Sequence, residues 1–381
     1  MKLLYVAPRF HPNQYPIIEG LIKKGHTVQF CVAHIGPTEK HDNVKVNLME
    51  QGFLSKILEK IFMLKGENHA ENRMQFFFIP RKNQIKKILK DFSPDAVVLR
   101  DRNFASLSFF RMCKKLKIDK VLLYNQSPIY TKPSTGFKGF LKKWFFAMFP
   151  KKRISVCRYE KFPFDKTGYV KDENAVFMPH VPRMNSLVNR TYSEDGMVRI
   201  FCCGKYRPYK NHMLVVEAAK KLADRGYENF YVTVVGQTDN DEEKKYYDDM
   251  KKRICEYGLD KHFNLLRSVP YDEIPNFYMN NDVFVLASGN EQATVSILDS
   301  LSYGLATIST SFNGTADYIR VGETGYVFET QNADDLSEKI EEYLKNPELA
   351  KIHGQNALKD IEEEYGFENY YKKYMKLMGE I

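Results

Sequence analysis

The sequence predicts two α/β domains, each built on a doubly wound parallel sheet with helices on both faces. Three observations predict this class. Short apolar runs alternate with amphipathic runs of helix length, the alternation restarts near Val198, and 381 residues are enough for two domains of ordinary size. Because 43% of the residues are hydrophobic, the chain has enough apolar side chains for two buried cores.

The first half carries the strand and helix pattern of a parallel sheet. Its first strand is a short apolar run, as expected for a buried strand, and strands separated by helices over many units imply a parallel sheet covered on both faces. Gly25 is placed to end the first helix, because glycine readily adopts the left-handed conformation found there. The predicted elements are strands 3–7, 27–33, 96–99, 120–124, 154–157 and 175–178 and helices 15–24 and 105–116.

The second half repeats this pattern with stronger helices. Each apolar strand is followed by a run in which charged and apolar residues alternate at helical spacing, which is typical of a helix covering a sheet. The predicted elements are strands 198–203, 230–235, 263–266, 283–287 and 306–309 and helices 212–225, 241–257, 274–280, 295–303 and 334–345.

Residues 179–196 separate the halves, because they contain two prolines and polar residues and show no periodicity. We therefore predict a first domain at residues 1–182, a second at 197–355 and a C-terminal segment at 356–381. Residues 367–378 of that segment are aromatic and basic at helical spacing. They predict a crossover helix that packs back on the first domain.

The two halves carry opposite charge. Residues 1–190 hold 35 Lys and Arg against 15 Asp and Glu, a balance of +20, and the remaining residues hold 22 against 33, a balance of −11, which together give the +9 of the chain. A basic half joined to an acidic half predicts two different tasks, with the basic half meeting an anionic partner.

Two stretches of the basic half break the sheet pattern. Residues 53–62 and 137–149 repeat large apolar side chains at helical spacing with lysines between them, and no acidic residue occurs from Lys132 to Arg153. An apolar face rimmed by lysines, with a tryptophan, is typical of a helix that lies in a membrane interface, which predicts an anionic membrane surface as a partner. The alternative is a core helix whose charges are solvated.

Other features indicate the compartment. No apolar run approaches the ~20 residues of a membrane-spanning helix, and the N-terminal apolar run meets Pro8 and Arg9 too soon for a signal peptide. The six cysteines show no CxxC spacing, so neither a zinc site nor a disulfide framework is indicated. We expect a cytoplasmic protein, with the inner face of the plasma membrane as its site when the basic half meets lipid.

Two loops of the second half place charged side chains after predicted strands. Residues 204–211 follow strand 198–203 and include Lys205 and Lys210, and residues 287–294 follow strand 283–287 and include Glu291. Ligands of open parallel sheets bind at the carboxyl ends of the strands, so we expect both loops to open onto a cleft.

These loops suit a nucleoside diphosphate. The free N–H groups of Thr294 and Val295 and the dipole of the helix they begin would face a phosphate, a field effect of about 0.3–2 kcal/mol. Lys205 and Lys210 would add full charges on the other side of the phosphate.

Two carboxylates complete the constellation. Asp299 can accept hydrogen bonds from both hydroxyls of a ribose, as acidic residues do in dinucleotide sites. Glu291, nearer the mouth, could hold hydroxyls of an attached sugar. Beside a diphosphate, such carboxylates make sense only if they contact hydroxyls, because like charges repel.

Several motifs occur together in this order. They are Gly204-Lys205-x4-Lys210, Ser288, the Glu291-x7-Asp299 pair, Gly304-x-Ala306-Thr307-Ile308 and Asn313-Gly314-x-x-Asp317. The set resembles a GT-B glycosyltransferase of family GT4, in which the usual forms are Gly-Arg-x4-Lys, Glu-x7-Glu and Gly-Gly-x-x-Glu. The resemblance covers nearly the whole chain, densely from Val198 to Tyr343 and loosely before Pro182.

The resemblance implies two Rossmann-like domains facing across a cleft and a retaining transfer from a UDP- or GDP-linked sugar, with no metal and no cofactor. It gives Lys205 and Lys210 the leaving diphosphate, Glu291 the donor sugar, Asp299 the ribose and the backbone of residues 267–269 the base. The implied catalytic residues are Glu291, Lys205 and Lys210. The implied donor-binding residues are Gly204, Lys205, Lys210, Arg267, Val269, Ser288, Glu291, Thr294, Val295 and Asp299.

The chain also departs from the usual family pattern. Asp299 is one methylene shorter than glutamate, and Lys205 keeps the charge of arginine without its bidentate fork. Gln292-Ala293-Thr294 replaces Gly-Phe-Gly, and residues 9–15 replace a Gly-Gly loop after the first strand. No catalytic base is assigned by the resemblance, and a retaining path in which a donor phosphate oxygen takes the acceptor proton does not require one.

Three residues after strands of the first half are acceptor-side candidates: His11, Asp101 and Gln126. His11 could be structural, and Asp101 could instead pair with Arg100 or Arg102. The acceptor we expect is a saccharide or a polyprenyl-diphosphate-linked saccharide in bacterial surface-polysaccharide assembly. The transferred group would be a hexosyl or N-acetylhexosaminyl unit.

Alternatives remain for the function and for one motif. A sugar-nucleotide epimerase of related fold, or a non-catalytic subunit that binds the nucleotide sugar, would use the same donor site. Nucleic-acid binding is disfavoured, because the basic residues lie between apolar residues of helices. Asp239-Asn240-Asp241 spells a metal-binding DxD signature, but Asn240 followed by Glu243 is better explained as a capping box that begins the next helix.

Overall fold

The computed structural model describes residues 1–36, 43–162, 165, 167–182, 190, 192, 195–289 and 291–379. Much of the predicted linker, and the last two residues of the predicted C-terminal segment, lie outside these residues. The chain forms two compact units. Unit 1 comprises residues 1–156, 168–181 and 367–381, and unit 2 comprises residues 157–167 and 182–366.

Unit 1 is built on a seven-stranded parallel sheet in the order β3-β2-β1-β4-β5-β7-β9, as predicted for a doubly wound domain. A separate antiparallel pair joins β6 and β8. The strands of unit 1 are β1 (Lys2–Ala7), β2 (Thr27–Val32), β3 (Lys45–Leu48), β4 (Ala96–Arg100), β5 (Val121–Asn125), β6 (Tyr130–Thr131), β7 (Arg153–Ser155), β8 (Val170–Lys171) and β9 (Ala175–Phe177). Its helices are α1 (Tyr15–Lys23), α2 (Phe53–Met63), α3 (Glu67–Phe77), α4 (Lys82–Phe92), α5 (Phe104–Lys115), α6 (Gly136–Phe146) and α13 (Phe367–Gly379), with a 3-10 turn at Pro12–Gln14.

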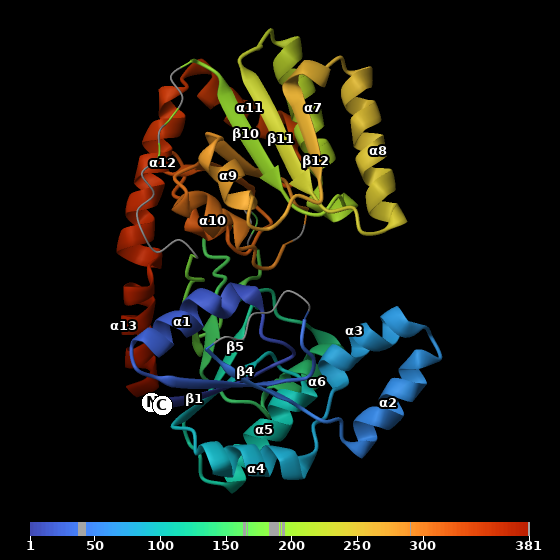
Figure 1. Cartoon of the computed structure of the whole chain (residues 1–381), viewed down its shortest axis with the longest axis vertical. Helices are drawn as coiled ribbons and strands as arrows, with labels where there is room; N and C mark the ends of the chain where they lie inside the picture. The colour runs from blue at the N-terminus through green and yellow to red at the C-terminus, as the bar shows by residue number, and fades with distance from the viewer. Residues whose placement is uncertain are drawn as a thin grey trace. The chain divides into compact units, whose positions relative to one another are not determined.

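The C-terminal helix α13 packs on α1 (Figure 1). Gly20 makes this contact possible, because a Cβ at that position would lie 2.2 Å from the ring of Phe367. Lys24 pairs with Glu368 at 2.9 Å, and His26 hydrogen-bonds to the hydroxyl of Tyr371 at 3.0 Å. The opposite face of the sheet is covered by α4 and α5 (Figure 1).

Unit 2 is built on a six-stranded parallel sheet in the order β12-β11-β10-β13-β14-β15. Its strands are β10 (Val198–Cys203), β11 (Phe230–Gly236), β12 (Phe263–Arg267), β13 (Val283–Leu286), β14 (Ala306–Thr310) and β15 (Gly325–Phe328). Its helices are α7 (His212–Asp224), α8 (Asp241–Glu256), α9 (Ile274–Met279), α10 (Ser296–Ser302), α11 (Ala333–Lys345) and α12 (Glu348–Asp360). Short 3-10 turns occur at Pro208–Lys210, Asp260–His262 and Ala316–Tyr318, and a π-helical turn at Ile361–Tyr365 follows α12.

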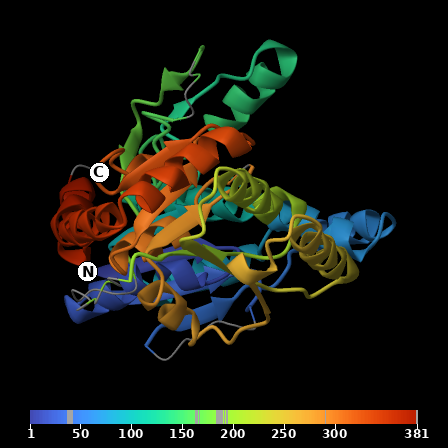
Figure 2. The ribbon, with the colours of Figure 1, turned by 90° about the horizontal axis from the view of Figure 1, so that it is seen from above.

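The helices of unit 2 form a layer on each face of its sheet. Helices α8 and α11 both contact α7, and α10 and α12 contact each other and β14 (Figures 1 and 2). The central strands are mostly apolar, and Val198, Ile200 and Cys202 of β10 are buried in the core of this unit. In the described part of the chain, no helix is both long enough and apolar enough to cross a membrane.

Candidate functional site

The candidate site of unit 2 lies at the carboxyl ends of β10 and β13, which are neighbours in the sheet. The chain leaves β10 toward β11 on one side and leaves β13 toward β14 on the other. The loops after these two strands therefore diverge, which opens a crevice at the point where the strand order reverses. Both loops predicted from the sequence begin at this point.

A backbone hydrogen bond and an ion pair join the two loops. The N–H of Gly289 donates to the carbonyl oxygen of Tyr209 at 2.8 Å. The ammonium of Lys210 forms an ion pair with the carboxylate of Glu291, and their side chains are only 15% and 14% exposed. The structure thus brings together two of the three predicted catalytic residues.

Lys205 has a different partner from the one expected. Its ammonium lies 2.8 Å from Asp239 Oδ2 and 3.9 Å from Glu243 Oε1, and both of these residues come from the chain around the start of α8. Lys205 and Lys210 were expected to lie together opposite the start of α10, but Lys205 pairs with Asp239 and Lys210 pairs with Glu291. Lys205 lies on the α8 side of the loop, because the carboxylates there compensate its charge.

The start of α8 is capped as predicted. Asn240 Oδ1 accepts a hydrogen bond from the Glu243 N–H at 3.0 Å, and Glu243 Oε2 accepts one from the Asp239 N–H at 2.6 Å. Burial raises the pKa of Glu243, but the hydrogen bonds from Asp239 and Arg207 and the charge of Lys205 outweigh it, so the pKa is lowered. The Asp239-Asn240-Asp241 sequence is therefore explained by a helix cap.

His212 is a residue of this site that was not predicted. It is buried at the start of α7, and its Nε2 lies 3.3 Å from the carbonyl oxygen of Gly204. A carbonyl only accepts, so Nε2 carries the proton. Burial, together with the charge of Lys210, lowers the pKa of His212 to about 4 despite the hydrogen bond to Gly204. The signal in the sequence that could have identified His212 as a site residue is its position two residues after Lys210.

Gly204 allows the stem of Lys210 to lie against the backbone. A Cβ at Gly204 would lie 3.3 Å from Lys210 Cδ and 3.4 Å from Lys210 Cε. The backbone of Gly204 has a φ of 156°. A glycine at this position therefore leaves room for the lysine side chain that reaches Glu291.

The start of α10 carries the next group of predicted residues. Thr294 Oγ1 hydrogen-bonds to Ser296 Oγ at 2.7 Å, and its carbonyl oxygen accepts from Thr315 Oγ1 at 3.2 Å. Val295 is the N-cap residue of α10, which begins one residue later than predicted. These contacts fix the turn that enters the helix.

Asp299 and Ser288 lie close to the end of the sheet. Burial and the nearby carboxylate of Asp299 raise the pKa of the Cys203 thiol to about 12, with Lys210 opposing, which places both charged groups near the end of β10. Ser288 is fully buried, and within the described part of the chain its hydroxyl oxygen has no hydrogen-bond partner. Such a buried hydroxyl suits a contact with a ligand.

Arg267 and Val269 stand where the sequence placed them, at the carboxyl end of β12. The guanidinium of Arg267 lies 4.7 Å from the centre of the Tyr247 ring. Ser268 between them has a φ of 53°, and its N–H donates to the carbonyl oxygen of Gly236 at 2.9 Å. The turn is thereby held against the end of β11.

The Asn313–Asp317 segment supports the loop that carries Glu291. The N–H of Gly314 donates to the Glu291 carbonyl oxygen at 3.0 Å. Asp317 accepts the backbone N–H groups of Glu160 at 2.7 Å and Lys161 at 3.0 Å, and burial raises its pKa. In the described residues Asp317 therefore acts as an anchor for the chain at residues 160–161.

The three acceptor-side candidates follow β1, β4 and β5, which are consecutive in the sheet of unit 1. His11 Nδ1 accepts a hydrogen bond from the Asn13 N–H at 3.3 Å. Asp101 adopts a φ of 63° and lies 3.8 Å from the Arg100 guanidinium, so the alternative pairing with arginine is realised. Burial raises the pKa of Asp101, with Arg100 and Arg102 opposing. Gln126 is half-buried.

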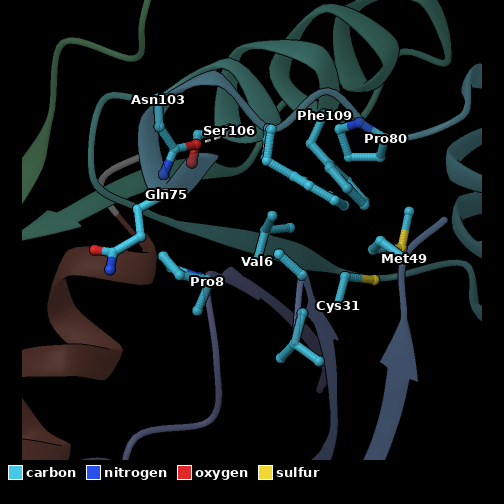
Figure 3. Close-up of a pocket in the computed structure, with 14 residues that line it drawn as sticks. Val6, Pro8, Cys31, Met49, Gln75, Pro80, Asn103, Ser106 and Phe109 are labelled. Carbon is cyan, nitrogen blue, oxygen red and sulfur yellow. Dashed lines mark hydrogen bonds between the residues drawn. The ribbon is translucent and has the colours of Figure 1, made fainter. Parts of the chain in front are cut away.

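A pocket that the sequence did not predict lies at the same edge of unit 1 (Figure 3). It lies between the ends of β1 and β2, α3 and the start of α5, and its cavity volume is only about 10 Å³. Its polar residues are Gln75, Asn103 and Ser106, and the Ser106 N–H donates to Asn103 Oδ1 at 2.9 Å in a hydrogen bond that caps α5. The remaining lining is mostly apolar and includes Val6, Pro8, Cys31, Met49, Phe78, Pro80 and Phe109.

The sequence of unit 2 is similar to known glycosyltransferases. Residues 190–360 match the family described as Glycosyl transferases group 1. A lipopolysaccharide core biosynthesis mannosyltransferase, LpcC from Rhizobium leguminosarum bv. viciae, is 28% identical over 184 residues, which are 46% of this chain and 51% of the relative. A putative glycosyltransferase, YtcC from Bacillus subtilis, is 24% identical over 56% of this chain and 55% of the relative. The chain thus spans about half the length of the curated relatives it matches.

Solved structures share the fold of the whole chain. A glycosyltransferase from Rickettsia africae has a TM-score of 0.74 at 18% identity, covering 100% of this chain and 98% of that one. Anabaena Alr3699/HepE, solved in complex with UDP, has a TM-score of 0.72 at 11% identity, with both chains fully covered. The chain therefore has the GT-B fold, and its residues 190–360 are similar to the group 1 glycosyltransferase family.

Proposed function

We propose that this chain is a retaining glycosyltransferase that moves a sugar from a nucleoside diphosphate sugar to a saccharide or lipid-linked saccharide. The observation that carries the proposal is the junction of the loops after β10 and β13. There, Lys210, Glu291 and Gly204 meet at the carboxyl edge of a family-matched unit. This edge is where open parallel sheets bind their ligands.

The donor diphosphate would lie against Lys210 and the start of α10. Lys210 is held by Glu291 when no ligand is bound, so binding would transfer its ammonium from a carboxylate to a phosphate oxygen. Glu291 would then be released to accept hydroxyls of the donor sugar. Stabilising the charge that develops on the leaving diphosphate is the largest rate contribution available to such a site.

Neighbouring groups would bind the rest of the donor. Asp299 would accept the ribose hydroxyls, the backbone at residues 267–269 would contact the base, and the buried Ser288 hydroxyl would find a partner in the ligand. Lys205 would add a second positive charge after exchanging Asp239 for a phosphate oxygen. In this proposal the lysine ammonium groups, and not a metal ion, neutralise the charge of the diphosphate, and no cofactor takes part.

The transfer would proceed on one face of the donor sugar. The bond from the anomeric carbon to the diphosphate breaks, the acceptor oxygen bonds to that carbon, and the acceptor proton passes to a donor phosphate oxygen. His11, Asp101 and Gln126 would orient the acceptor from the strand ends of unit 1. The similarity to a lipopolysaccharide core mannosyltransferase supports a hexosyl donor and an acceptor in bacterial surface-polysaccharide assembly. The similarity to a structure with bound UDP supports a nucleotide donor.

Substitution of the two lysines tests this function. We expect Lys205→Ala and Lys210→Ala each to lower turnover of the preferred nucleotide sugar by about 10²-fold or more, the scale of losing one preorganised charge stabiliser. Lys251→Ala, which removes an exposed lysine of α8, is the matched control and should leave turnover unchanged. Release of nucleoside diphosphate with an oligosaccharide acceptor measures the rate. Wild-type rates in both site variants would refute the assignment.

A further inference from the structure

Helix α6 exposes a complete apolar face. Phe137, Phe140, Leu141 and Trp144 follow one another at spacings of three, one and three residues, so they share one side of the helix. All four are exposed, Phe137 by 75% and Trp144 by 61%. This helix of unit 1 therefore exposes a continuous stripe of aromatic and aliphatic side chains to solvent. Such a continuous stripe, unlike isolated exposed apolar residues, indicates an interaction surface.

Helix α2 shows the same feature. Its apolar residues Phe53, Leu54, Ile57 and Ile61 are exposed, and Leu64 just beyond the helix is 86% exposed. The opposite side of the helix is anchored in unit 1, because the buried Ser55 hydroxyl accepts the Ile79 N–H at 3.1 Å. The exposed stripe is therefore held outward by the packing of the other side.

One aromatic cluster connects the two helices. The ring centre of Phe62 in α2 lies 5.4 Å from that of Phe77 in α3. The ring centre of the neighbouring Phe76 lies 5.6 Å from that of Phe145 in α6. Phe104 of α5 contacts both α3 and α6, because its ring centre lies 5.5 Å from that of Phe77 and 5.9 Å from that of Phe145. Both helices thus extend from the same packed cluster, α2 at the rim of unit 1 in Figure 1 and α6 at its periphery in Figure 2.

Exposed lysines flank both apolar stripes. On helix α6, Lys138 and Lys143 lie beside the stripe, and Lys151 follows the helix. Around α2 the lysines are Lys56, Lys60 and Lys65. No aspartate or glutamate occurs between Lys132 and Arg153, so no nearby carboxylate in that sequence neutralises the cations of α6.

We propose that the apolar stripes of α2 and α6, with their flanking lysines, form a docking surface for an anionic lipid bilayer. The apolar side chains would enter the acyl and headgroup boundary, and the lysines would reach back to lipid phosphates. Trp144 lies where an interfacial tryptophan is favoured. The excess of positive charge favours anionic lipid over a second copy of this chain, because two such surfaces would repel each other. The proposal goes beyond the transfer reaction and does not depend on it.

The single tryptophan of the chain makes the test specific to α6. The full-length protein is mixed with vesicles of phosphatidylcholine alone or of equal parts phosphatidylcholine and phosphatidylglycerol. We expect flotation with the anionic vesicles only, a blue shift of Trp144 emission on binding, and quenching by lipids brominated on the acyl chains. Added salt should release the protein, because screening weakens the attraction of its lysines to the surface.

Paired variants separate the two components of the surface. Lys138→Glu with Lys143→Glu should weaken partition to anionic vesicles at least about tenfold, since each lysine near the surface contributes about 1 kcal/mol. Phe137→Ser with Phe140→Ser should leave weak electrostatic association but abolish the Trp144 blue shift, and Leu54→Ser with Ile57→Ser should reduce partition in the same way. Lys251→Glu with Lys252→Glu on α8 and Tyr271→Ser, all exposed in unit 2, are the controls and should bind as wild type. Circular dichroism confirms that each variant is folded.

Three outcomes would overturn the proposal. The first is equal flotation with neutral and anionic vesicles, and the second is flotation without any change in Trp144 emission. The third is a dimer in light scattering that Phe137→Ser with Phe140→Ser dissociates, combined with no vesicle binding. That result would assign the surface to a second copy of the chain.

Discussion

Lys210 and Glu291 form an ion pair that is mostly shielded from water. A shielded pair of this kind depends on its partner, because removing one member leaves the other charge uncompensated. A diphosphate that replaces Glu291 as the partner of Lys210 keeps the ammonium compensated throughout. Under the proposed function, Lys210 would therefore exchange one anionic partner for another when the donor binds.

Glu291→Gln separates binding from transfer. We expect the amide to compete less for Lys210, so a nucleoside diphosphate should bind at least as tightly as it does to wild type. Turnover should fall about 10²-fold, because the sugar hydroxyls lose a charged acceptor. Calorimetric titration with UDP and GDP measures the first effect, and an acceptor assay measures the second. Binding about tenfold weaker than wild type would contradict the exchange of partners.

His212 predicts a pH dependence of stability. Its pKa in the folded chain is about 4, below the ordinary value of about 6.5, so the unfolded chain binds more protons between these values. The contribution of neutral His212 is complete above about pH 6.5 and is lost as the pH falls toward 4.

His212→Gln should remove this contribution while keeping a donor for the Gly204 carbonyl. From pH 7 to pH 5, the free energy of unfolding of wild type should fall by roughly 2 kcal/mol more than that of the variant. Urea denaturation at the two pH values measures the difference. An identical pH dependence in both proteins would show that burial of His212 does not lower its pKa as described.

The loop between β13 and α10 is shaped by a close approach at Gly314. A Cβ at this position would lie 1.7 Å from the Gln292 carbonyl oxygen and 2.8 Å from Cys157 Sγ. In the same loop, the Glu291 carbonyl oxygen accepts a hydrogen bond from the Gly314 N–H. An alanine must therefore displace the segment that positions Glu291.

Gly314→Ala should destabilise unit 2 by roughly 1–3 kcal/mol, the usual cost of overpacking. Gly289→Ala in the loop between β13 and α10 is the matched control, because a Cβ there would meet nothing closer than 3.7 Å. Denaturant midpoints of the two variants test this comparison. If they are equal, the close approach at Gly314 has no energetic consequence.

The elements that the sequence predicted best are the central strands. The apolar runs of β1 and β13 have no alternation because both faces of a parallel strand are buried, and this pattern is local. Helix α4 and strand β3 were not predicted. In α4 the residues Ile85, Leu89 and Phe92 are buried at helical spacing, so the signal was present in the sequence. In β3 no residue is buried, and its place is set by pairing with β2.

The candidate site was predictable where it depends on strand ends and not where it depends on the paths of loops. Lys210 and Glu291 follow neighbouring strands, so their proximity follows from sheet topology. The pairing of Lys205 with Asp239 depends on how the loop after β11 folds against the start of α8, which residue spacing does not specify. The pocket of unit 1 depends likewise on the packing of α3 against α5, so no local motif marks it.

At the scale of the whole molecule, all predicted donor-binding residues belong to unit 2. Binding of a nucleoside diphosphate should therefore slow amide hydrogen exchange chiefly at residues 204–211 and 288–299. The α1 and β2 amides of unit 1 should exchange at unchanged rates and serve as an internal reference. Hydrogen exchange read by mass spectrometry measures both regions in one sample. Protection confined to unit 1 would place the nucleotide elsewhere.

The most direct test of the central claim is thermal unfolding with UDP, GDP and ADP, measured on wild type and on the Lys205→Ala, Lys210→Ala double variant. A ligand at about 100 times its Kd stabilises the state it binds by about 2.7 kcal/mol. We predict that at least one of these diphosphates raises the Tm of wild type and that this rise disappears in the double variant. An equal rise in both proteins, or no rise with any diphosphate, would contradict the claim that these two lysines bind the donor.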